Sequence, residues 1–230
     1  MPRDFVVGIP TLNRYDLLAR LLQNLNDKDS TVDRIAVVDN GGKLHDYIDE
    51  NSDLLQRVNV YSPHKNIGVS ASWNFIMHNF CSDIALLVND DVTFCKNSLK
   101  IIRKFIDKDT KNGIWTTSAR TANNFSCFAI SKKFFEKIGD FDESFYPAYF
   151  EDNDYAFRIK LAKEEFVYID DVVCNHDGSS TLKKFDSNQM EDHHKSFRKN
   201  RDYYMAKWGG MPEYERFTIP FAGGTYAPRS

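Results

Sequence analysis

Short apolar segments alternate with amphipathic ones through the first half of the chain, and this alternation limits the possible folds more than any other feature. Residues 5–9 and 35–38 are apolar runs with the length of strands that are buried on both faces. Between them, leucines recur at helical spacing within Tyr15–Asn26. A strand, a helix and a second strand predict two parallel strands joined by a right-handed crossover. We therefore expect an α/β fold with a mostly parallel, Rossmann-like central sheet flanked by helices.

The pattern continues along the chain with less regular spacing. Val58–Tyr61 and residues 86–88 are further candidate strands, and Val69, Trp73 and Ile76 mark a helix between them. The later elements that we expect are strands at residues 115–117 and 126–130, and helices at residues 98–106, at residues 134–138 and from about Asp152.

Polar side chains follow three of these strands at the point where each strand ends. They occupy residues 11–14, then Asp39 and Asn40, and finally residues 89–91. We expect Pro10 to end the first strand. Because ligands of open α/β sheets bind beyond the carboxyl ends of the strands, these groups predict a site at one edge of the sheet.

Asp90 and Asp91 are the strongest candidates for chemistry at that edge. Adjacent carboxylates repel each other and are costly to desolvate, so such a pair usually faces water or a cation. Their oxygens suit Mg²⁺ or Mn²⁺, and the alternative is a solvated acidic turn. No G-x-G-x-x-G follows the first strand, and no G-x-x-x-x-G-K-[ST] occurs. A phosphate would therefore be held by a metal or by side chains.

Composition narrows the classes of partner. The net charge is −3, which argues against a dominant nucleic-acid surface. The four cysteines have no C-x-x-C spacing, so we expect reduced thiols, no zinc site and a cytoplasmic location. The N-terminus lacks a hydrophobic targeting region, and no apolar run reaches membrane-spanning length.

Four motifs resemble the family-2 glycosyltransferases with the GT-A fold, in their order and approximate spacing. They are residues 9–14, residues 38–40, residues 66–68 and residues 89–91. Members of that family transfer a sugar from a nucleotide diphosphate. The resemblance implies a GT-A sheet, a smaller acceptor-side subregion and a C-terminal helical extension.

The resemblance also implies which residues bind the donor. The candidates for this nucleotide-sugar pocket are Pro10, Thr11, Asn13, Arg14, Asp39, Asn40, Asn66, Gly68, Asn74, Asn89, Asp90 and Asp91. Within this set, Asp39 would accept a hydrogen bond from a uracil or thymine ring N–H. Asp91 would be the metal ligand of an element like the family's D-x-D. Asn89 departs from that element, since many members carry Asp there.

A second acidic element, residues 141–155, resembles the family's G-x-F-D-E-x-F…E-D-x-D element. It implies Asp152 as the general base that removes the proton of the acceptor hydroxyl, with Glu151 as the second choice. We expect Asp154 to complement the dipole of the helix that starts here. Arg158 is expected to pair with a nearby acid.

His176 ends an apolar run and precedes a Gly-Ser loop, as in family members in which a His completes the metal coordination. A lone His is more often structural. The resemblance implies that Asp91, His176, diphosphate oxygens and water hold Mn²⁺ or Mg²⁺. Residues 179–181 would contact the diphosphate or simply form the turn.

We expect one GT-A catalytic domain over residues 1–185, with a nucleotide-binding half (1–92) and an acceptor half (93–185). Residues 186–230 form a polar helix, at about residues 190–207, and an extended tail that packs on the core. Arg198 and Lys199 are mainly solvated, with phosphate contact as the alternative.

The function that these features predict is an inverting transfer from a UDP- or dTDP-sugar to an acceptor hydroxyl, with a glycan as the ordinary acceptor. A protein, or a modified base in viral DNA, is the alternative acceptor. The alternative classes are a nucleotidyltransferase and a non-catalytic glycan-binding module on the same fold. Asn89 gives the last of these some support.

Overall fold

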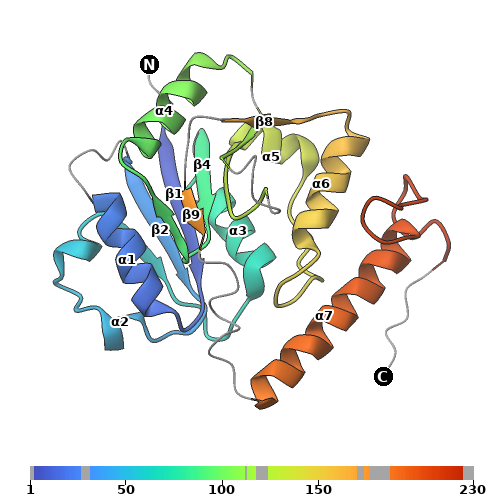
Figure 1. Ribbon diagram of the computed structural model, residues 1–230, viewed down its shortest axis with the longest axis horizontal. Helices are drawn as coiled ribbons and strands as arrows, with labels where there is room; N and C mark the ends of the chain where they lie inside the picture. The colour runs from blue at the N-terminus through green and yellow to red at the C-terminus, as the bar shows by residue number, and fades with distance from the viewer. Residues whose placement is uncertain are drawn as a thin grey trace.

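The computed structural model describes residues 3–26, 32–111, 113–117, 124–169, 174–176 and 187–224, with backbone alone at residues 174–176, 188 and 189 (Figure 1). The strands are β1 (Phe5–Thr11), β2 (Arg34–Asp39), β3 (Val58–Tyr61), β4 (Ile84–Val88), β5 (Val92–Phe94), β6 (Ile114–Thr116), β7 (Cys127–Ser131), β8 (Phe166–Tyr168) and β9 (Cys174–His176). The helices are α1 (Tyr15–Asn26), α2 (Leu44–Tyr47), α3 (Gly68–Asn79), α4 (Ser98–Lys108), α5 (Lys132–Ile138), α6 (Glu151–Leu161) and α7 (Ser187–Trp208), with a 3₁₀ turn at Asp53–Leu55.

The central sheet has seven strands in the order β3-β2-β1-β4-β7-β6-β8. The pairs β1·β2, β1·β4, β2·β3 and β6·β8 are parallel, whereas β7 runs antiparallel to β4 and β6. The predicted mostly parallel α/β sheet is confirmed. The chain moves outward from β1 to β3 and then returns to the other side of β1 with β4, so the strand order reverses between β1 and β4.

Pro10 does not end the first strand, contrary to our expectation. β1 continues through Pro10 to Thr11, and Thr11 lies opposite Asp39 in the register with β2. On its other side, β4 pairs with β1 only as far as Gly8. The missing N–H of Pro10 therefore leaves no bond of the β4 ladder unmade.

Helices cover both faces of the sheet because alternate strand residues point to opposite sides. Phe5, Val7 and Ile9 pack with the apolar residues of α1 and α4. Val6 lies in a second cluster with apolar residues of α3, α5 and α6. The leucine pattern predicted α1 with the bounds that it has, Tyr15–Asn26.

The three-residue strands were the hardest to predict. β5 and β8 were not expected, because a strand this short has too few residues to show an alternating pattern. β5 begins directly after Asp91 and pairs antiparallel with β9 in a small second sheet. β8 is the edge strand of the main sheet, beside β6.

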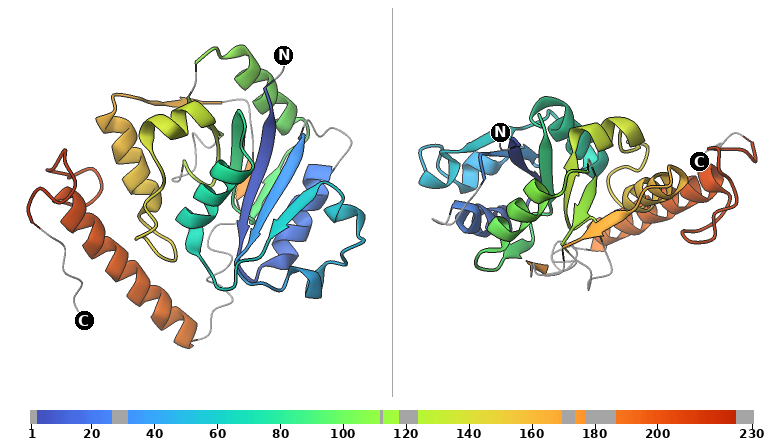
Figure 2. Two further views of the ribbon diagram at one scale, coloured as in Figure 1. Left: turned by 180° about the vertical axis from the view of Figure 1, so that it is seen from behind. Right: turned by 90° about the horizontal axis from the view of Figure 1, so that it is seen from above.

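The C-terminal helix α7 packs on α6 and on the loop before it, on the side of the molecule away from α1 (Figures 1 and 2). Phe145, Phe150 and Phe157 form one buried cluster with Tyr204 and Trp208 of α7.

The tail is not extended over its described part. The backbone N–H groups of Arg216 and Phe217 donate to Trp208 O, so the chain folds back on the end of α7. Within the described residues, no helix has the length and apolar character that crossing a membrane requires.

Candidate active site

The carboxyl ends of β1 and β4 meet at the point where the strand order reverses. The hydroxyl of Thr11, the last residue of β1, donates to Asp90 Oδ2 over 2.7 Å. Residues 89–91 follow β4 in a turn that the backbone N–H of Val92 closes by donating to Asn89 O. The polar ends of two strands that are far apart in the sequence are therefore in direct contact.

Burial dominates the electrostatics of this acidic pair. It raises the pKa of Asp90 to about 7, an effect that the neighbouring charge of Asp91 reinforces and the hydrogen bond from Thr11 opposes. Asp91 itself is only 8% exposed. Two carboxylates with so little access to water are stabilised by a cation, and such a cation can also contact a bound ligand.

Arg14 provides positive charge beside the two acids. Its guanidinium is 6% exposed and holds Asp16 with Nε and Nη2, at 3.0 and 3.2 Å. The hydrogen bond to Asp16 raises the pKa of Arg14. Burial works against this rise in pKa, and the charges of Asp90 and Asp91 add to it. Its Nη1 is buried and has no hydrogen-bond partner among the described residues. A buried donor without a partner is a natural contact for an anionic ligand.

Asp39 has a different task from the one that the resemblance implied. Its side chain is fully buried. Oδ1 accepts from Tyr15 Oη and from the backbone N–H groups of Gly41 and Gly42, and Oδ2 accepts from the N–H of Leu44. Direct contact with a base ring is therefore not open to Asp39 in this structure, because the carboxylate shapes the loop after β2.

Hydrogen bonds connect the end of β2 to the start of α3, through Asn40, Asn66 and Gly68. The amide of Asn40 donates to Ser72 Oγ and accepts from the N–H of Ile67, and Asn66 Oδ1 accepts from the N–H of Gly68. Gly68 has φ +82°, and a Cβ there would lie 2.8 Å from Pro147 O. Glycine is required at this position by both the backbone angle and the close approach of the loop.

Asn74 was expected in the donor pocket, but it clamps the loop before α6. Its Nδ2 donates to Phe141 O and Glu143 Oε1, both at 2.9 Å, and its Oδ1 accepts from the N–H of Phe141 at 2.8 Å. Asn66 and Asn74 also line an open hollow of about 710 Å³, together with Glu143 and Tyr146.

The remaining donor-site candidates lie around the same strand ends. Pro10 is buried within β1, and Asn13 is exposed with φ +57°, a left-handed conformation that Asn tolerates. Asn89 is half-buried, and its backbone N–H donates to Ser126 O.

The backbone of β9 brings His176 next to the acidic turn. His176 lies opposite Val92 in the β5–β9 register, and Val92 directly follows Asp91. The side chain of His176 and residues 179–181 lie outside the described part of the chain. The described residues contain no cluster of three or more His, Cys, Asp or Glu side chains that is placed to hold a metal. The carboxylate oxygens of Asp90 and Asp91 are of the kind that a hard cation takes as ligands, with phosphate oxygens and water as the others.

The second acidic element begins α6, whose first turn lies at the same lower end of Figure 1 as the carboxyl end of β1. Tyr149 and Phe150 precede it with left-handed φ angles of 81° and 70°. Residues other than Gly, Asn and Asp rarely adopt this backbone conformation, which costs about 1–3 kcal/mol per residue. The surrounding contacts must therefore hold this bend.

Glu151 and Asp152 differ in how far water reaches them. Glu151 is 6% exposed, and its Oε2 has no hydrogen-bond partner among the described residues. Burial, followed by the charge of Asp152, raises the pKa of Glu151 well above its ordinary value. Asp152 is half-buried, accepts from the N–H of Asn153, and also has a pKa that burial raises. The accessible carboxylate of the two is Asp152.

Asp154 does more than complement the helix dipole. It is fully buried and accepts from Arg158 Nε at 2.9 Å, from Trp208 Nε1 at 2.8 Å and from Lys207 Nζ at 2.6 Å. The expected pairing of Arg158 with an acid is confirmed. Lys207 also donates to Asp142 Oδ2 at 2.7 Å, so one buried lysine ties two acids of the loop and α6 to α7.

Sequence reasoning missed the supporting residues on α7. Asn200 and Lys207 are buried although the helix reads as polar, while Arg198 and Lys199 are exposed as expected. Asn200 and Lys207 are seven residues apart, with Tyr204 between them, so all three lie on one face of the helix. This helical spacing was the available signal, but it is hard to recognise because two of the three residues are polar.

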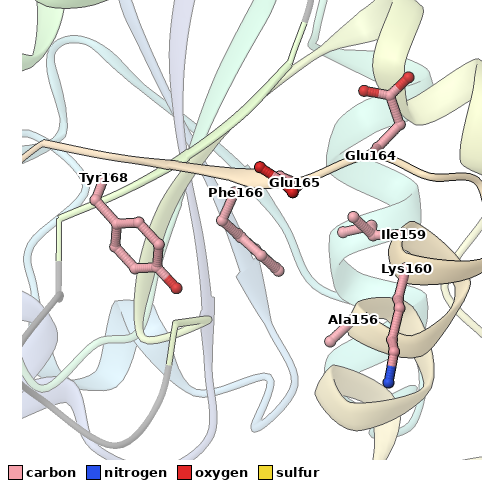
Figure 3. Close-up of a pocket in the computed structure, with 7 residues that line it drawn as sticks. All are labelled: Ala156, Ile159, Lys160, Glu164, Glu165, Phe166 and Tyr168. Atoms are coloured by element: carbon pink, nitrogen blue, oxygen red, sulfur yellow. The ribbon is translucent and has the colours of Figure 1, made fainter.

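A further hollow, of about 320 Å³, lies between α6 and the edge strand β8 and contains none of the candidate residues (Figure 3). Its lining consists of Ala156, Ile159, Lys160, Glu164, Glu165, Phe166 and Tyr168.

Several solved structures share the fold. A mannosyltransferase from Pyrobaculum calidifontis in complex with GDP-Man and Mn²⁺ superposes with a TM-score of 0.59 at 16% identity, over 86% of this chain and 65% of that one. GalNAc-T7 with UDP, GalNAc and Mn²⁺ gives a TM-score of 0.61 at 13% identity, over 89% of this chain and 51% of that one. Residues 1–349 of TarS from S. aureus, in complex with UDP-GlcNAc, give 0.60 at 15% identity, over 88% and 65%.

This chain thus spans about half to two thirds of the length of these structures. No curated protein matches the sequence. The sheet and its flanking helices confirm the expected GT-A fold. The sequence profile of glycosyl transferase family 2 matches residues 6–165, which is more than half of the chain. The chain therefore belongs to glycosyl transferase family 2.

Proposed function

We propose that this chain is a metal-dependent, inverting glycosyltransferase that moves a sugar from a nucleotide-diphosphate donor to an acceptor hydroxyl. The observation that carries the proposal is the group formed where β1 and β4 end. Thr11 contacts Asp90, Asp91 is nearly buried beside it, and Arg14 has a buried N–H that no described residue accepts. This combination of acids for a cation and a guanidinium for phosphate oxygens suits a diphosphate.

Within the proposal, Arg14 binds and orients the diphosphate. Thr11 fixes the carboxylate of Asp90, and Asp91 with His176 holds the divalent cation. The β5–β9 pairing supports this assignment, because it brings the backbone of His176 beside the residue that follows Asp91. A bound Mn²⁺ or Mg²⁺ supplies charge stabilisation for the departing diphosphate.

Asp152 is the proposed general base. It is more accessible than Glu151, and burial moves its pKa upward, towards the range in which a carboxylate accepts a proton effectively near neutral pH. Its carboxylate takes the proton of the acceptor hydroxyl while that oxygen forms the new bond to the anomeric carbon. A single base with direct displacement inverts the configuration at that carbon.

The donor base is the least constrained part of the proposal. We expected a UDP- or dTDP-sugar through Asp39, but Asp39 is buried and its oxygens serve the loop after β2. The neighbours of like fold were solved with GDP-Man, with UDP and with UDP-GlcNAc. A test must therefore include guanine, uracil and thymine donors. We propose a glycan as the acceptor.

The test is a thermal-shift panel of UDP-glucose, UDP-galactose, UDP-GlcNAc, GDP-mannose and dTDP-glucose, each with Mn²⁺ and with EDTA. Bound ligand raises the Tm by mass action, so we expect one donor to stabilise the protein with Mn²⁺ and much less with EDTA. Product analysis with that donor should show a nucleoside diphosphate. Released pyrophosphate would indicate nucleotidyl transfer instead, and no shift and no slow donor hydrolysis would favour a non-catalytic binding module.

A further inference from the structure

Asn200 is a buried amide on a polar and largely exposed stretch of the helix α7. Asn200 is fully buried, whereas Arg198, Lys199 and Arg201 around it are exposed or half-buried. Its Nδ2 donates to Ala148 O at 2.8 Å and to Tyr149 O at 3.2 Å. Two carbonyl oxygens require a donor, so these partners fix the orientation of the amide.

The two carbonyls belong to the bend that starts α6. Tyr149 and Phe150 are the consecutive left-handed residues, and the N–H of Asp154 donates to Phe150 O to begin the helix. Asn200 therefore holds the chain three to four residues before Asp152. Lys207 and Trp208, about two turns further along α7, hold Asp154, which lies two residues after Asp152.

The two donated bonds are the reason for an Asn at position 200. Its Oδ1 is buried without a hydrogen-bond partner among the described residues. An unsatisfied buried polar atom costs about 1–3 kcal/mol, a cost that an apolar side chain would avoid. An apolar side chain such as leucine, however, is larger than Asn and would leave the two carbonyls of the strained bend without their donor.

We propose that Asn200 is a positioning residue for the transfer reaction: through the carbonyls of Ala148 and Tyr149 it holds the bend that aims Asp152 at the acceptor hydroxyl. α7 lies beyond the residues that the family profile matches, so this support comes from outside the matched domain. The inference rests on the proposed role of Asp152.

The test compares Asn200→Leu and Asn200→Asp with Lys195→Leu, an exposed position on the same helix. Leu removes both hydrogen bonds, and Asp replaces the donor by an acceptor that repels the carbonyls. We expect kcat for release of nucleoside diphosphate from the donor found in the panel to fall about 10–100-fold in both variants, with the donor KM within twofold. The Lys195→Leu variant should keep the kcat of the unmodified protein.

Two further measurements separate positioning from general damage. In Asn200→Leu, loosening the bend admits water to Asp152, so the pKa of Asp152 should move down and the acid limb of the kcat/KM profile should shift to lower pH. Hydrogen exchange should speed up at residues 149–155 while the amides of β1 and β4 keep their protection.

Unchanged kcat, acid limb and exchange in the Asn200 variants would overturn this inference. So would equal losses in Asn200→Leu and Lys195→Leu. The Asp152→Asn variant distinguishes the role of Asp152 as general base from the role of Asn200 as positioning residue. If this variant retains full turnover, the proposed role of Asp152 fails. If it loses turnover while both Asn200 variants keep theirs, only the role of Asn200 fails.

Discussion

The strand-end half and the helix half of the candidate site are held in different ways. At the strand ends, Asp39 takes its backbone hydrogen bonds from residues two to five positions further along the chain. In the helix half, Asp142 and Asp154 accept side-chain hydrogen bonds from Lys207 and Trp208, which lie 65 and 54 residues further along the chain. The strand ends are brought together by the sheet and shaped by local loops, whereas the helix half depends on a distant helix.

Substitutions in the two halves of the site should therefore have different effects. A change at the strand ends removes a ligand contact and leaves the sheet intact, since the strand pairings run through buried backbone. A change in the α6–α7 contact disturbs packing, ion pairs and the position of Asp152 together.

Asp152→Asn should reduce kcat by about 10²–10⁴-fold, because Asn cannot accept the proton of the acceptor hydroxyl. Donor affinity with Mn²⁺ should stay within about twofold, since the donor residues lie on the strand ends. Steady-state kinetics and calorimetric titration of the donor measure the two quantities. Asp140→Asn, an exposed acid near the same loop, is the matched control and should change neither. Full activity of Asp152→Asn would remove the general base from the mechanism.

Lys207→Met should destabilise the protein by about 3–5 kcal/mol, because it leaves the buried Asp154 and the half-buried Asp142 without their shared cation. For a chain of this size that corresponds to a fall in Tm of about 6–20 °C. Calorimetry of Lys195→Met, an exposed lysine on the same helix, should show almost no change. Adding Asp154→Asn to Lys207→Met should recover part of the loss, and a Tm equal to that of Lys195→Met would contradict the structural role of α7.

Asp91→Ala should remove the metal-dependent part of donor affinity, about 10–100-fold, and should leave the Tm of the unliganded protein nearly unchanged. Titration of the donor with Mn²⁺ and then with EDTA gives the two affinities for each protein. Glu50→Ala, an exposed acid far along the chain, serves as control. The coordination proposal is contradicted if the variant and the unmodified protein respond equally to Mn²⁺.

Glu151→Gln should change the pH dependence of stability more than stability itself. Burial raises the pKa of Glu151 in the folded state above its value in the unfolded chain, so the folded protein binds the proton more tightly. Raising the pH above about 4.5 therefore costs stability, up to about 1.4 kcal/mol per pH unit, until the folded-state pKa is reached.

Gln does not titrate, so the Tm of Glu151→Gln relative to the unmodified protein should rise between pH 5 and pH 8. Glu50→Gln, at an exposed position, should show a constant difference over the same range. A constant difference for Glu151→Gln as well would mean that its carboxyl group is not buried as the structure has it.

Much of the fold was readable from the residues, because hydrophobic periodicity directly reports which faces are buried. The leucines of α1 and the apolar runs of β1 to β4 gave the correct elements and a mostly parallel sheet. β5 and β8 escaped because three residues carry no period. Asn74 was assigned to the donor, since a sequence cannot show that its amide faces the backbone of Phe141.

The sequence by itself determined the family and showed that polar and acidic residues follow three of the strands. These features can be read directly because they depend on residues that are neighbours in the chain. The tertiary structure alone decided that Asp39 is enclosed by its own loop, that Arg14 keeps a buried donor beside Asp90, and that α7 supports the start of α6. The physical reason is that burial and hydrogen-bond partners are set by segments that meet only after folding. The same carboxylate can therefore bind a ligand, pair with a lysine or shape a loop.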